Sequence, residues 1–321
     1  MKVLVTGGAG FIGSHTVDRL LRDGAEVAVL DEFNDYYNPA IKRANVAAFQ
    51  GRVRVFEGDL RDRETVHSVC REGGFDAIIH LAARAGVRPS ISDPELYLNT
   101  NIYGTHHLLE AARACSVPRF LFASSSSVYG INKKVPFSET DRIEQTISPY
   151  AMTKMCGEQM CSNYANLYGI RTVCLRFFTV YGPRQRPDLA ISKFTRLIDE
   201  GKPVPRYGDG TTARDYTYVD DIVDGIMAAL AYEGELFDIF NLGGSQTTTL
   251  NELIAAVEQA LGKQAVIDPQ PMQPGDVPRT FADVSKAGRL LGYAPHTPIR
   301  EGIPRFVRWY QEMKARQVTV A

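Results

Sequence analysis

The sequence predicts an α/β fold in which a doubly wound parallel sheet is joined to a smaller, discontinuous α+β domain. Three observations support this prediction. Short apolar segments alternate with amphipathic segments through the first half of the chain, a glycine-rich turn follows the first apolar segment, and loops rich in Gly, Pro and Arg begin after residue 178. Alternating strands and helices are typical of a parallel sheet that is covered by helices on both faces.

Apolar runs in the first half predict six strands, at residues 2–5, 26–30, 53–57, 76–82, 119–124 and 170–177. Helical patterns lie between and after them, at 12–21, 101–114, 149–168, 220–232, 250–261, 284–291 and 299–316. Segment 201–215 is rich in Gly, Pro and Thr, so no long regular element is expected there. We expect a sheet domain of residues 1–178 plus about 215–242, and a substrate-binding domain of 179–214 plus 243–321.

The turn after the first strand contains Gly7, Gly8, Gly10 and Gly13 and leads directly into a helix. Gly8, Gly10 and Gly13 have the spacing of the dinucleotide-binding pattern, and a second set that starts at Gly7 overlaps it. A helix N-terminus offers unpaired N–H groups and a partial positive charge, and glycines let the backbone approach a pyrophosphate. The turn therefore predicts a dinucleotide site.

Asp31 ends the second predicted strand, at about the distance beyond the glycines that the dinucleotide fingerprint expects. A carboxylate at this place accepts hydrogen bonds from both ribose hydroxyls of adenosine and repels a 2′-phosphate. The alternative is a solvated acid at a strand end, but the three spaced glycines favour the cofactor interpretation. We therefore expect NAD rather than NADP.

Composition and charge exclude several classes of protein. The chain has 321 residues, of which 44% are hydrophobic and 23% charged, as in ordinary globular proteins. A net charge of −1 gives no global attraction to nucleic acid or to an anionic membrane. The five cysteines lack paired metal-ligand spacing, and no apolar run approaches the roughly 20 residues that span a bilayer. With a strand expected from residue 2, we predict no signal peptide and no metal, and a cytoplasmic location.

Tyr150 and Lys154 stand four residues apart on a predicted helix, so their side chains share one face. A nearby ammonium favours the phenolate and is expected to lower the tyrosine pKa from its usual value of about 10. Such a phenol can act as a general acid and base on a sugar hydroxyl. The same spacing occurs on plain surface helices, and the dinucleotide turn in this chain is what favours the catalytic interpretation.

Four serines follow the predicted strand 119–124, namely Ser124, Ser125, Ser126 and Ser127. Ligands of parallel sheets bind at the C-terminal ends of the strands, and a serine there can donate to a hydroxyl and to the carbonyl that forms from it. The alternative is a polar turn after a strand. No Gly-x-Ser-x-Gly elbow surrounds these serines, so a hydrolase triad is not supported.

Taken together, these motifs resemble the extended short-chain dehydrogenase/reductases, and more closely the nucleotide-sugar epimerases and dehydratases. The resemblance runs from residue 1 to about 309 and includes the glycine turn, Asp31, residues 58–60 and 80–83, and the serine and tyrosine motifs. It implies a Rossmann-like sheet domain. It also implies that Ser125 completes the catalytic set with Tyr150 and Lys154, and that Ser126 and Ser127 line the same pocket.

The resemblance further implies a bound NAD and a homodimer that forms through the helices at 101–114 and 149–168. In the family, Asp59 and Leu60 would meet the adenine, Ala82 the cofactor backbone and Lys154 the nicotinamide ribose. The full set of expected cofactor contacts is Gly7, Gly10, Phe11, Ile12, Gly13, Asp31, Asp59, Leu60, Leu81, Ala82, Ala83, Asn99, Tyr150, Lys154 and Phe177.

The reaction subtype is predicted from two missing carboxylates. The family's 4,6-dehydratases carry Asp-Glu directly after the catalytic threonine, and its UDP-glucuronate decarboxylases carry Glu two residues after theirs. Here these positions are Ser126 and Ser127, so dehydration and decarboxylation are disfavoured. What remains is oxidation at one carbon followed by reduction from the opposite face, which is epimerisation.

Segment 176–188 is similar to UDP-glucuronate 4-epimerases almost residue for residue, and segment 84–90 also resembles them. UDP-galactose 4-epimerases carry Asn where Thr179 stands. A uronate carboxylate needs hydroxyl or cationic partners once it is desolvated, and the candidates are Thr179, Arg186 and Arg88. Alternatively, these arginines hold the phosphates of UDP or lie in solvent.

The nucleotide half of the substrate is assigned by the resemblance. Arg214 would bind the pyrophosphate, Asp276 the uridine ribose, and Arg279 would add a second phosphate contact. Gln273 stands where galactose epimerases carry Arg, which weakens the galactose interpretation. Thr280 is small where some epimerases have a bulky residue, so an N-acetylated sugar is not excluded sterically.

The sequence thus predicts NAD-dependent C4 epimerisation of a UDP-sugar through a 4-keto intermediate, with UDP-glucuronate to UDP-galacturonate as the favoured reaction. A UDP-glucose/UDP-galactose or UDP-N-acetylhexosamine 4-epimerase is the first alternative. A UDP-glucuronate decarboxylase and a non-catalytic NAD-binding regulator are less favoured. A regulator would not need Ser125, Tyr150 and Lys154, yet all three are present.

Overall fold

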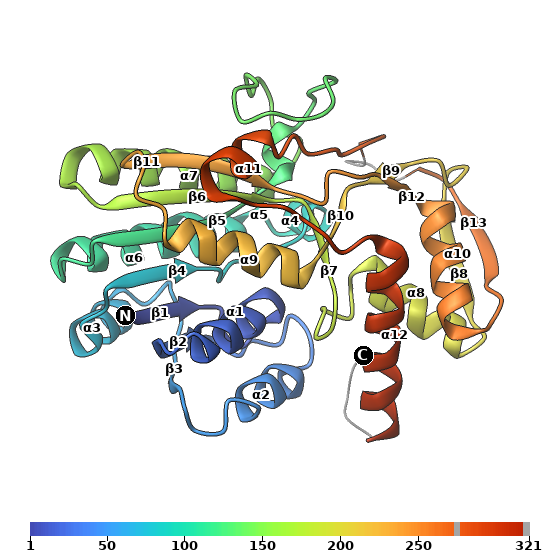
Figure 1. Ribbon diagram of the computed structural model, residues 1–321, viewed down its shortest axis with the longest axis horizontal. Helices are drawn as coiled ribbons and strands as arrows, with labels where there is room; N and C mark the ends of the chain where they lie inside the picture. Colours follow the sequence, from blue (N-terminus) through green and yellow to red (C-terminus); the bar gives the residue numbers. More distant parts are fainter. Residues whose placement is uncertain (273–276, 317–321) are drawn as a thin grey trace.

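The computed structural model describes residues 1–272 and 277–316, and its centre is a seven-stranded sheet (Figure 1). All neighbouring strands are parallel, in the order β11-β6-β5-β4-β1-β2-β3. In chain order the strands are β1 (Lys2–Thr6), β2 (Glu26–Asp31), β3 (Arg54–Glu57), β4 (Ala77–His80), β5 (Arg119–Ser125), β6 (Arg171–Phe177) and β11 (Phe237–Leu242). The parallel α/β prediction is confirmed.

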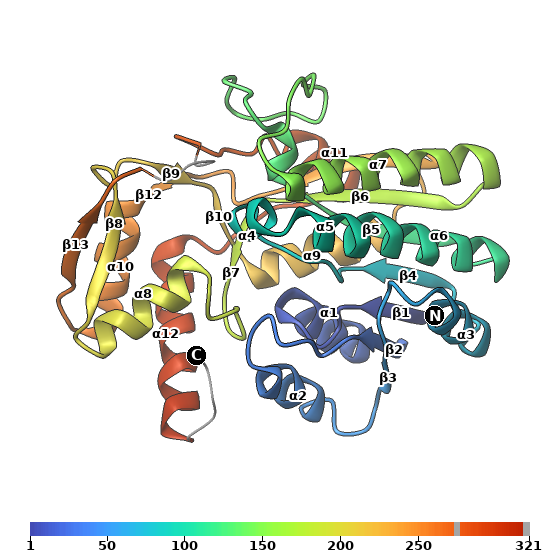
Figure 2. The ribbon, with the colours of Figure 1, turned by 180° about the vertical axis from the view of Figure 1, so that it is seen from behind.

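Helices cover both faces of this sheet, as Figures 1 and 2 show from opposite sides. One face carries α1 (Phe11–Arg22) and α9 (Val219–Leu230), and the other carries α3 (Arg63–Gly73), α6 (Gly104–Ala114) and α7 (Pro149–Tyr168). Successive strand residues face opposite layers, so Val3 and Val5 of β1 pack with Val17 and Ile222, whereas Leu4 belongs to the other core. Packing on both faces fixes the strands of the sheet, and their C-terminal ends lie along one edge of it.

The smaller lobe is built mostly from the second half of the chain and lies beside that edge (Figure 1). Three two-stranded sheets contribute to it, pairing β7 (Thr179–Tyr181) with β10 (Tyr216–Tyr218), β8 (Pro203–Tyr207) with β13 (Val266–Gln270), and β9 (Ala213–Arg214) with β12 (Thr248–Thr249). Its helices are α8 (Ala190–Asp199), α10 (Leu250–Leu261) and α12 (Ile299–Ala315). By contrast, α11 (Ser285–Leu291) contacts β11 and α9. The predicted domain boundaries stay a prediction.

Two predicted elements differ from the structure for local reasons. The helix expected at 101–114 is preceded by the short helices α4 (Val87–Ser92) and α5 (Pro94–Tyr97) and by a π-helical segment, η1 (Leu98–Tyr103). The Asn101 side chain bonds the backbone of Arg84 in both directions and also donates to Thr153, which holds the widened turn in place. The strand expected at 76–82 ends at His80, because the next residues bend over the glycine turn.

None of the helices in residues 1–272 and 277–316 combines the length and the apolar character that a membrane crossing requires.

Candidate active site

A cavity of about 480 Å³ opens at the C-terminal ends of β1, β2, β4, β5 and β6. It brings together residues that the sequence analysis took from distant motifs. The predicted site residues that line it are Gly7, Gly10, Phe11, Ile12, Gly13, Asp31, Asp59, Leu60, Leu81, Ala82, Ala83, Ser125, Ser127, Tyr150, Lys154, Phe177, Thr179 and Arg186. The predicted cofactor residues and the predicted catalytic residues therefore share one continuous space.

The glycine turn forms a cradle that side chains would fill. Gly7 has φ +71°, and a Cβ there would lie 2.7 Å from the backbone nitrogen of Ala82. A Cβ on Gly13 would lie 2.1 Å from the backbone oxygen of Gly7. Gly10 precedes α1 without a side-chain cap, so the first N–H groups of this helix face the turn. These features fit a pyrophosphate, and the residues present therefore fit a bound NAD.

Asp31 is buried at the end of β2 and shares its carboxylate with other groups. Oδ1 accepts hydrogen bonds from Lys42 Nζ and from the backbone nitrogen of Phe33, both at 3.0 Å. Oδ2 accepts one from the backbone nitrogen of Ala9 at 3.2 Å. A carboxylate has about four acceptor positions, so one remains for a ribose hydroxyl. Lys42 also lines the cavity, so the ribose would meet Asp31 and Lys42 together.

His80, the last residue of β4, joins the end of β1 to α6. Its Nδ1 lies 2.8 Å from Thr6 Oγ1, and its Nε2 lies 2.9 Å from Thr105 Oγ1. Thr105 donates its own proton to the backbone oxygen of Asn101, so His80 must donate from Nε2 and accept at Nδ1. Burial lowers the pKa of His80 to about 3, which keeps this ring neutral. Thr6 in turn accepts from the backbone nitrogen of Ala82.

Tyr150 lies in the first turn of α7, beside the serines that end β5. Ser148 caps this helix by accepting from the backbone nitrogen of Ala151, and Pro149 occupies its first turn, so the helix begins just before Tyr150. Ser125 Oγ donates to Ser127 Oγ at 3.1 Å. It is also close enough to the Tyr150 phenol to oppose the rise in the pKa of that group that burial causes. The Tyr150 phenol and the Ser125 hydroxyl therefore line the same part of the cavity.

The prediction that Lys154 lowers the pKa of the Tyr150 phenol is wrong when only the groups of the protein are considered. Burial raises the pKa of Tyr150, and the contributions that oppose this come from the hydrogen bond to Ser125 and from the charge of Arg186. Lys154 Nζ instead donates to the backbone oxygen of Ala123 at 2.7 Å, and it lies 5.9 Å from the centre of the Tyr150 ring. Burial also lowers the pKa of Lys154 itself, to about 8.

A buried ion pair lies next to the predicted catalytic residues. Glu158, one turn beyond Lys154 on α7, accepts from Nε and Nη2 of Arg176 at 2.9 and 2.8 Å. Ser124 Oγ also donates to Glu158, and the Arg176 guanidinium lies 4.9 Å from the centre of the Tyr129 ring. The sequence does not predict this pair, although Lys154 and Glu158 have a spacing that places them on one face of the helix.

Other lining residues that were not predicted as site residues include Tyr36, Tyr37, Lys42 and Arg84. Tyr36, Tyr37 and Lys42 follow β2, where the sequence has no motif of its own, whereas Arg84 begins the segment 84–90 that resembles the UDP-glucuronate 4-epimerases. Tyr36 donates to the backbone oxygen of Ala85 at 2.9 Å, and it lies 5.4 Å beneath the Arg186 guanidinium. Aromatic residues shortly after a predicted cofactor acid are the one signal that could have indicated them.

Several predicted residues lie outside the cavity lining. Ser126 and Asn99 are next to lining residues but do not line the cavity themselves. The Arg88 guanidinium lies 5.0 Å from the centre of the Tyr207 ring. Arg214 is on β9, Arg279 forms a bridge with the adjacent residue, and the two arginines lie together in the smaller lobe. Predicted Asp276 lies outside the described residues, as does Gln273.

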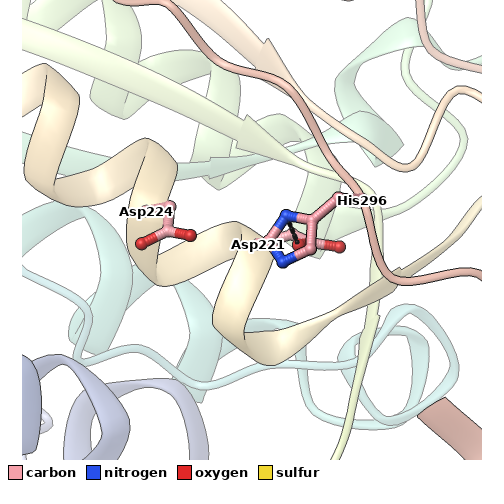
Figure 3. A group of neighbouring side chains, drawn as sticks. All are labelled: Asp221, Asp224 and His296. Atoms are coloured by element: carbon pink, nitrogen blue, oxygen red, sulfur yellow. Dashed lines mark ion pairs between the residues drawn. The ribbon is translucent and has the colours of Figure 1, made fainter. Parts of the chain in front are cut away.

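A second group of titratable side chains lies away from the cavity, at Asp221, Asp224 and His296 (Figure 3). Protein groups bind several of its polar atoms. Asp221 pairs with His296 Nδ1 at 3.0 Å and accepts from the backbone nitrogen of Thr297, while Asp224 pairs with Arg19. These contacts link α9 to the segment before α12 and to α1.

The fold and the cavity define the class of extended short-chain dehydrogenase/reductases. Within it, the chain belongs to the family described as GDP-mannose 4,6 dehydratase, whose sequence profile matches residues 4–306.

Similar proteins are known in both sequence and structure. UDP-glucuronate 4-epimerase 4 of Arabidopsis thaliana is 42% identical over 328 residues, covering 97% of this chain and 75% of that protein. The probable UDP-glucuronate 4-epimerase of Rhizobium meliloti is 38% identical and 99% of each chain is covered. The UDP-glucuronic acid 4-epimerase of Bacillus cereus, solved with UDP-glucuronic acid and NAD, has a TM-score of 0.92 at 36% identity, with 98% of this chain and 100% of that chain covered.

A neutral-sugar enzyme is also similar. The UDP-glucose 4-epimerase of Thermus thermophilus, solved with NAD, has a TM-score of 0.89 at 37% identity. The match covers 97% of this chain and 99% of that chain. The similar solved structures thus include 4-epimerases of a uronate and of a neutral sugar, as well as a dTDP-glucose 4,6-dehydratase from Streptomyces venezuelae.

Proposed function

We propose that this protein is an NAD-dependent UDP-sugar 4-epimerase that interconverts UDP-glucuronate and UDP-galacturonate through a 4-keto sugar. The observation that carries the proposal is the shared cavity, in which Tyr150, Ser125 and Arg186 lie beside the glycine cradle. The similarity to UDP-glucuronate 4-epimerases from a plant and two bacteria supports this choice of sugar.

In this proposal the protein groups move one proton and hold one developing carbonyl. NAD, when bound, supplies the hydride acceptor and donor of the reaction. Tyr150 takes the proton of the C4 hydroxyl and later returns it, and Ser125 donates to the C4 oxygen as it becomes a ketone. Lys154 holds α7 against β5, so that the phenol and the serine stay in place. The sugar must turn between the two half-reactions so that its opposite face is reduced.

The nucleotide end would stay bound while the sugar turns, which keeps the effective concentration of the intermediate high. We assign its phosphates to Arg214 and Arg279 in the smaller lobe and its uridine ribose to Asp276. The two arginines lie on neighbouring segments, since the residue before Arg214 forms a bridge with Arg279. Arg88 remains a candidate for the substrate, from its place above Tyr207 between the two lobes.

The uronate carboxylate adds a chemical hazard. A 4-keto-uronate is a β-keto acid, and it loses CO₂ when the C5–C6 bond stands perpendicular to the ketone plane. We assign the restraint of this carboxylate to Thr179 and Arg186, which both line the cavity. At the positions where decarboxylases and dehydratases of the family carry acids, this chain carries Ser126 and Ser127. Epimerisation is therefore the outcome that these residues favour.

We further propose a homodimer in the cytoplasm, formed through α6 and α7. Large hydrophobic side chains are exposed at the C-terminal end of α7, with Leu167 at 71% and Tyr168 at 50%, and directly before α6, with Tyr103 at 59%. Exposed large apolar side chains are common at interfaces between subunits. Light scattering coupled to gel filtration tests the oligomeric state.

A UDP-glucose 4-epimerase is the second candidate, because such enzymes are among the similar structures. The test is incubation of the protein with UDP-glucuronate and no added reductant, followed by NMR of the anomeric protons. We expect the UDP-galacturonate signal to grow until the two sugars reach equilibrium. Conversion of UDP-glucose in a parallel reaction, with UDP-glucuronate unchanged, would overturn our choice of sugar.

A further inference from the structure

The guanidinium of Arg186 already has a carboxylate partner inside the protein. Its Nε donates to Oδ1 of Asp188 at 3.0 Å, and its Nη2 donates to Oδ2 at 2.8 Å. One face of the guanidinium lies 5.4 Å from the centre of the Tyr36 ring. The Asp188 side chain is 44% exposed, whereas that of Arg186 is 17% exposed. Asp188 therefore occupies one edge of the Arg186 guanidinium, and Tyr36 lies next to this cation, before any substrate binds.

The edge of the guanidinium that Asp188 occupies determines which N–H groups of Arg186 remain for a ligand. A guanidinium carries five N–H donors and can hold a carboxylate through either of two edges. Asp188 takes the edge made by Nε and Nη2, so the edge made by Nη1 and Nη2 remains with three N–H groups. Arg186 lines the cavity and acts electrostatically on Tyr150, whereas Asp188 does not line it. The free edge is therefore the one available to a sugar next to Tyr150.

The loop that carries this pair is fixed from the opposite side by α1. His15 Nε2 lies 2.8 Å from the backbone oxygen of Pro183, and Arg184 Nη1 lies 2.7 Å from Asp18 Oδ2. Arg184 has φ +63°, a conformation uncommon for residues other than glycine, which surrounding contacts must hold in place. The Arg186–Asp188 pair thus belongs to a loop whose course is set, and it is not a chance contact of two surface side chains.

We propose that Asp188 is a specificity-determining positioning residue, which turns the free edge of Arg186 toward the C6 carboxylate of a UDP-uronate. This inference rests on the proposed function. Asp188 also balances the charge of Arg186, so a neutral sugar does not meet an uncompensated cation. Only a substrate with a carboxylate gains the two parallel hydrogen bonds of the free edge. Loss of Asp188 is expected to weaken uronate binding and to leave binding of the UDP portion unchanged.

The test compares Asp188→Ala and Asp188→Glu with the unchanged protein. We expect Asp188→Ala to raise KM for UDP-glucuronate about tenfold, the loss of one well-placed charged hydrogen bond. Its kcat should fall less, and the Kd for UDP alone should not change. Asp188→Glu keeps the carboxylate, so it should recover part of the loss. The matched control is Asp23→Ala, which removes an exposed aspartate that pairs with Arg19 away from the cavity.

Three outcomes overturn the inference. An unchanged KM in Asp188→Ala would show that Arg186 needs no orientation. A lower KM would show that Asp188 acts only as a competing charge. Equal weakening of UDP and UDP-glucuronate binding would show a general structural role. If the unchanged protein does not epimerise UDP-glucuronate at all, it is the proposed function that fails, and that result is seen before any variant is measured.

Discussion

Lys154 Nζ donates a 2.7 Å hydrogen bond to the backbone oxygen of Ala123, and this bond fastens α7 to the end of β5. Tyr150 stands one turn before Lys154, and Ser125 stands two residues after Ala123. The bond therefore sets the distance between the phenol and the serine hydroxyl that share the cavity. The Lys154 ammonium therefore acts mainly by positioning α7, since burial, and not the charge of the lysine, dominates the pKa of Tyr150.

Replacing Tyr150 with Phe removes the phenol that lies beside Ser125 in the described site. We expect kcat for epimerisation to fall by about 10² to 10⁴, the usual contribution of a general acid and base. The Kd for NAD, measured by fluorescence titration, should change little, because the glycine cradle and Asp31 are untouched. A variant that keeps its activity would contradict the assignment of Tyr150 as the acid and base.

Thr179→Ala tests the restraint of the uronate carboxylate. Thr179 lines the cavity near Arg186, and its hydroxyl is one of two assigned partners of C6. Without it we expect more loss of CO₂ from the keto sugar, so the ratio of UDP-pentose to UDP-galacturonate should rise. Mass spectrometry of the products measures this ratio, with Thr179→Ser as the matched control that keeps a hydroxyl. An unchanged ratio would contradict the restraint.

The elements that sequence predicted well are those whose signal is local. The glycine cradle could be predicted because Gly7, Gly10 and Gly13 encode a backbone geometry within one turn. The bounds of α7 were predicted to the residue, because Ser148, Pro149 and Gly169 mark its ends by their own chemistry.

The residues that sequence did not predict depend on contacts between distant segments. Lys42 reaches Asp31 only because α2 (Pro39–Ala47) folds back over the end of β2. Arg88 was predicted as a candidate partner of the substrate carboxylate, but the position of its guanidinium beside Tyr207 of the smaller lobe was not predicted. The pKa of Tyr150 could not be predicted from Lys154, because burial is a property of the whole site.

His80 predicts a pH dependence of stability. Burial lowers its pKa to about 3 in the folded protein, whereas an unfolded histidine titrates near 6.5. Between these values the unfolded chain binds one more proton, so the free energy of unfolding falls as the pH drops from about 6.5 toward 3. The slope from this residue is at most about 1.4 kcal/mol per pH unit.

Urea titrations at several pH values between 7 and 4 measure this slope. His80→Gln should be less stable at pH 7, because Thr6 and Thr105 lose part of their bonding. Its stability should nevertheless depend less steeply on pH, since glutamine takes up no proton. Parallel curves for the two proteins would show that His80 is not the group responsible.

The Glu158–Arg176 pair predicts a strong coupling between two substitutions. Both side chains are nearly inaccessible, at 1% for Glu158 and 3% for Arg176. Arg176→Met alone leaves a buried carboxylate without its cation, which typically costs about 3–5 kcal/mol. Adding Glu158→Leu removes the stranded charge, so the double variant should recover much of that loss. Urea unfolding of the single and double variants completes the cycle, and costs that simply add would show that the ion pair is not coupled.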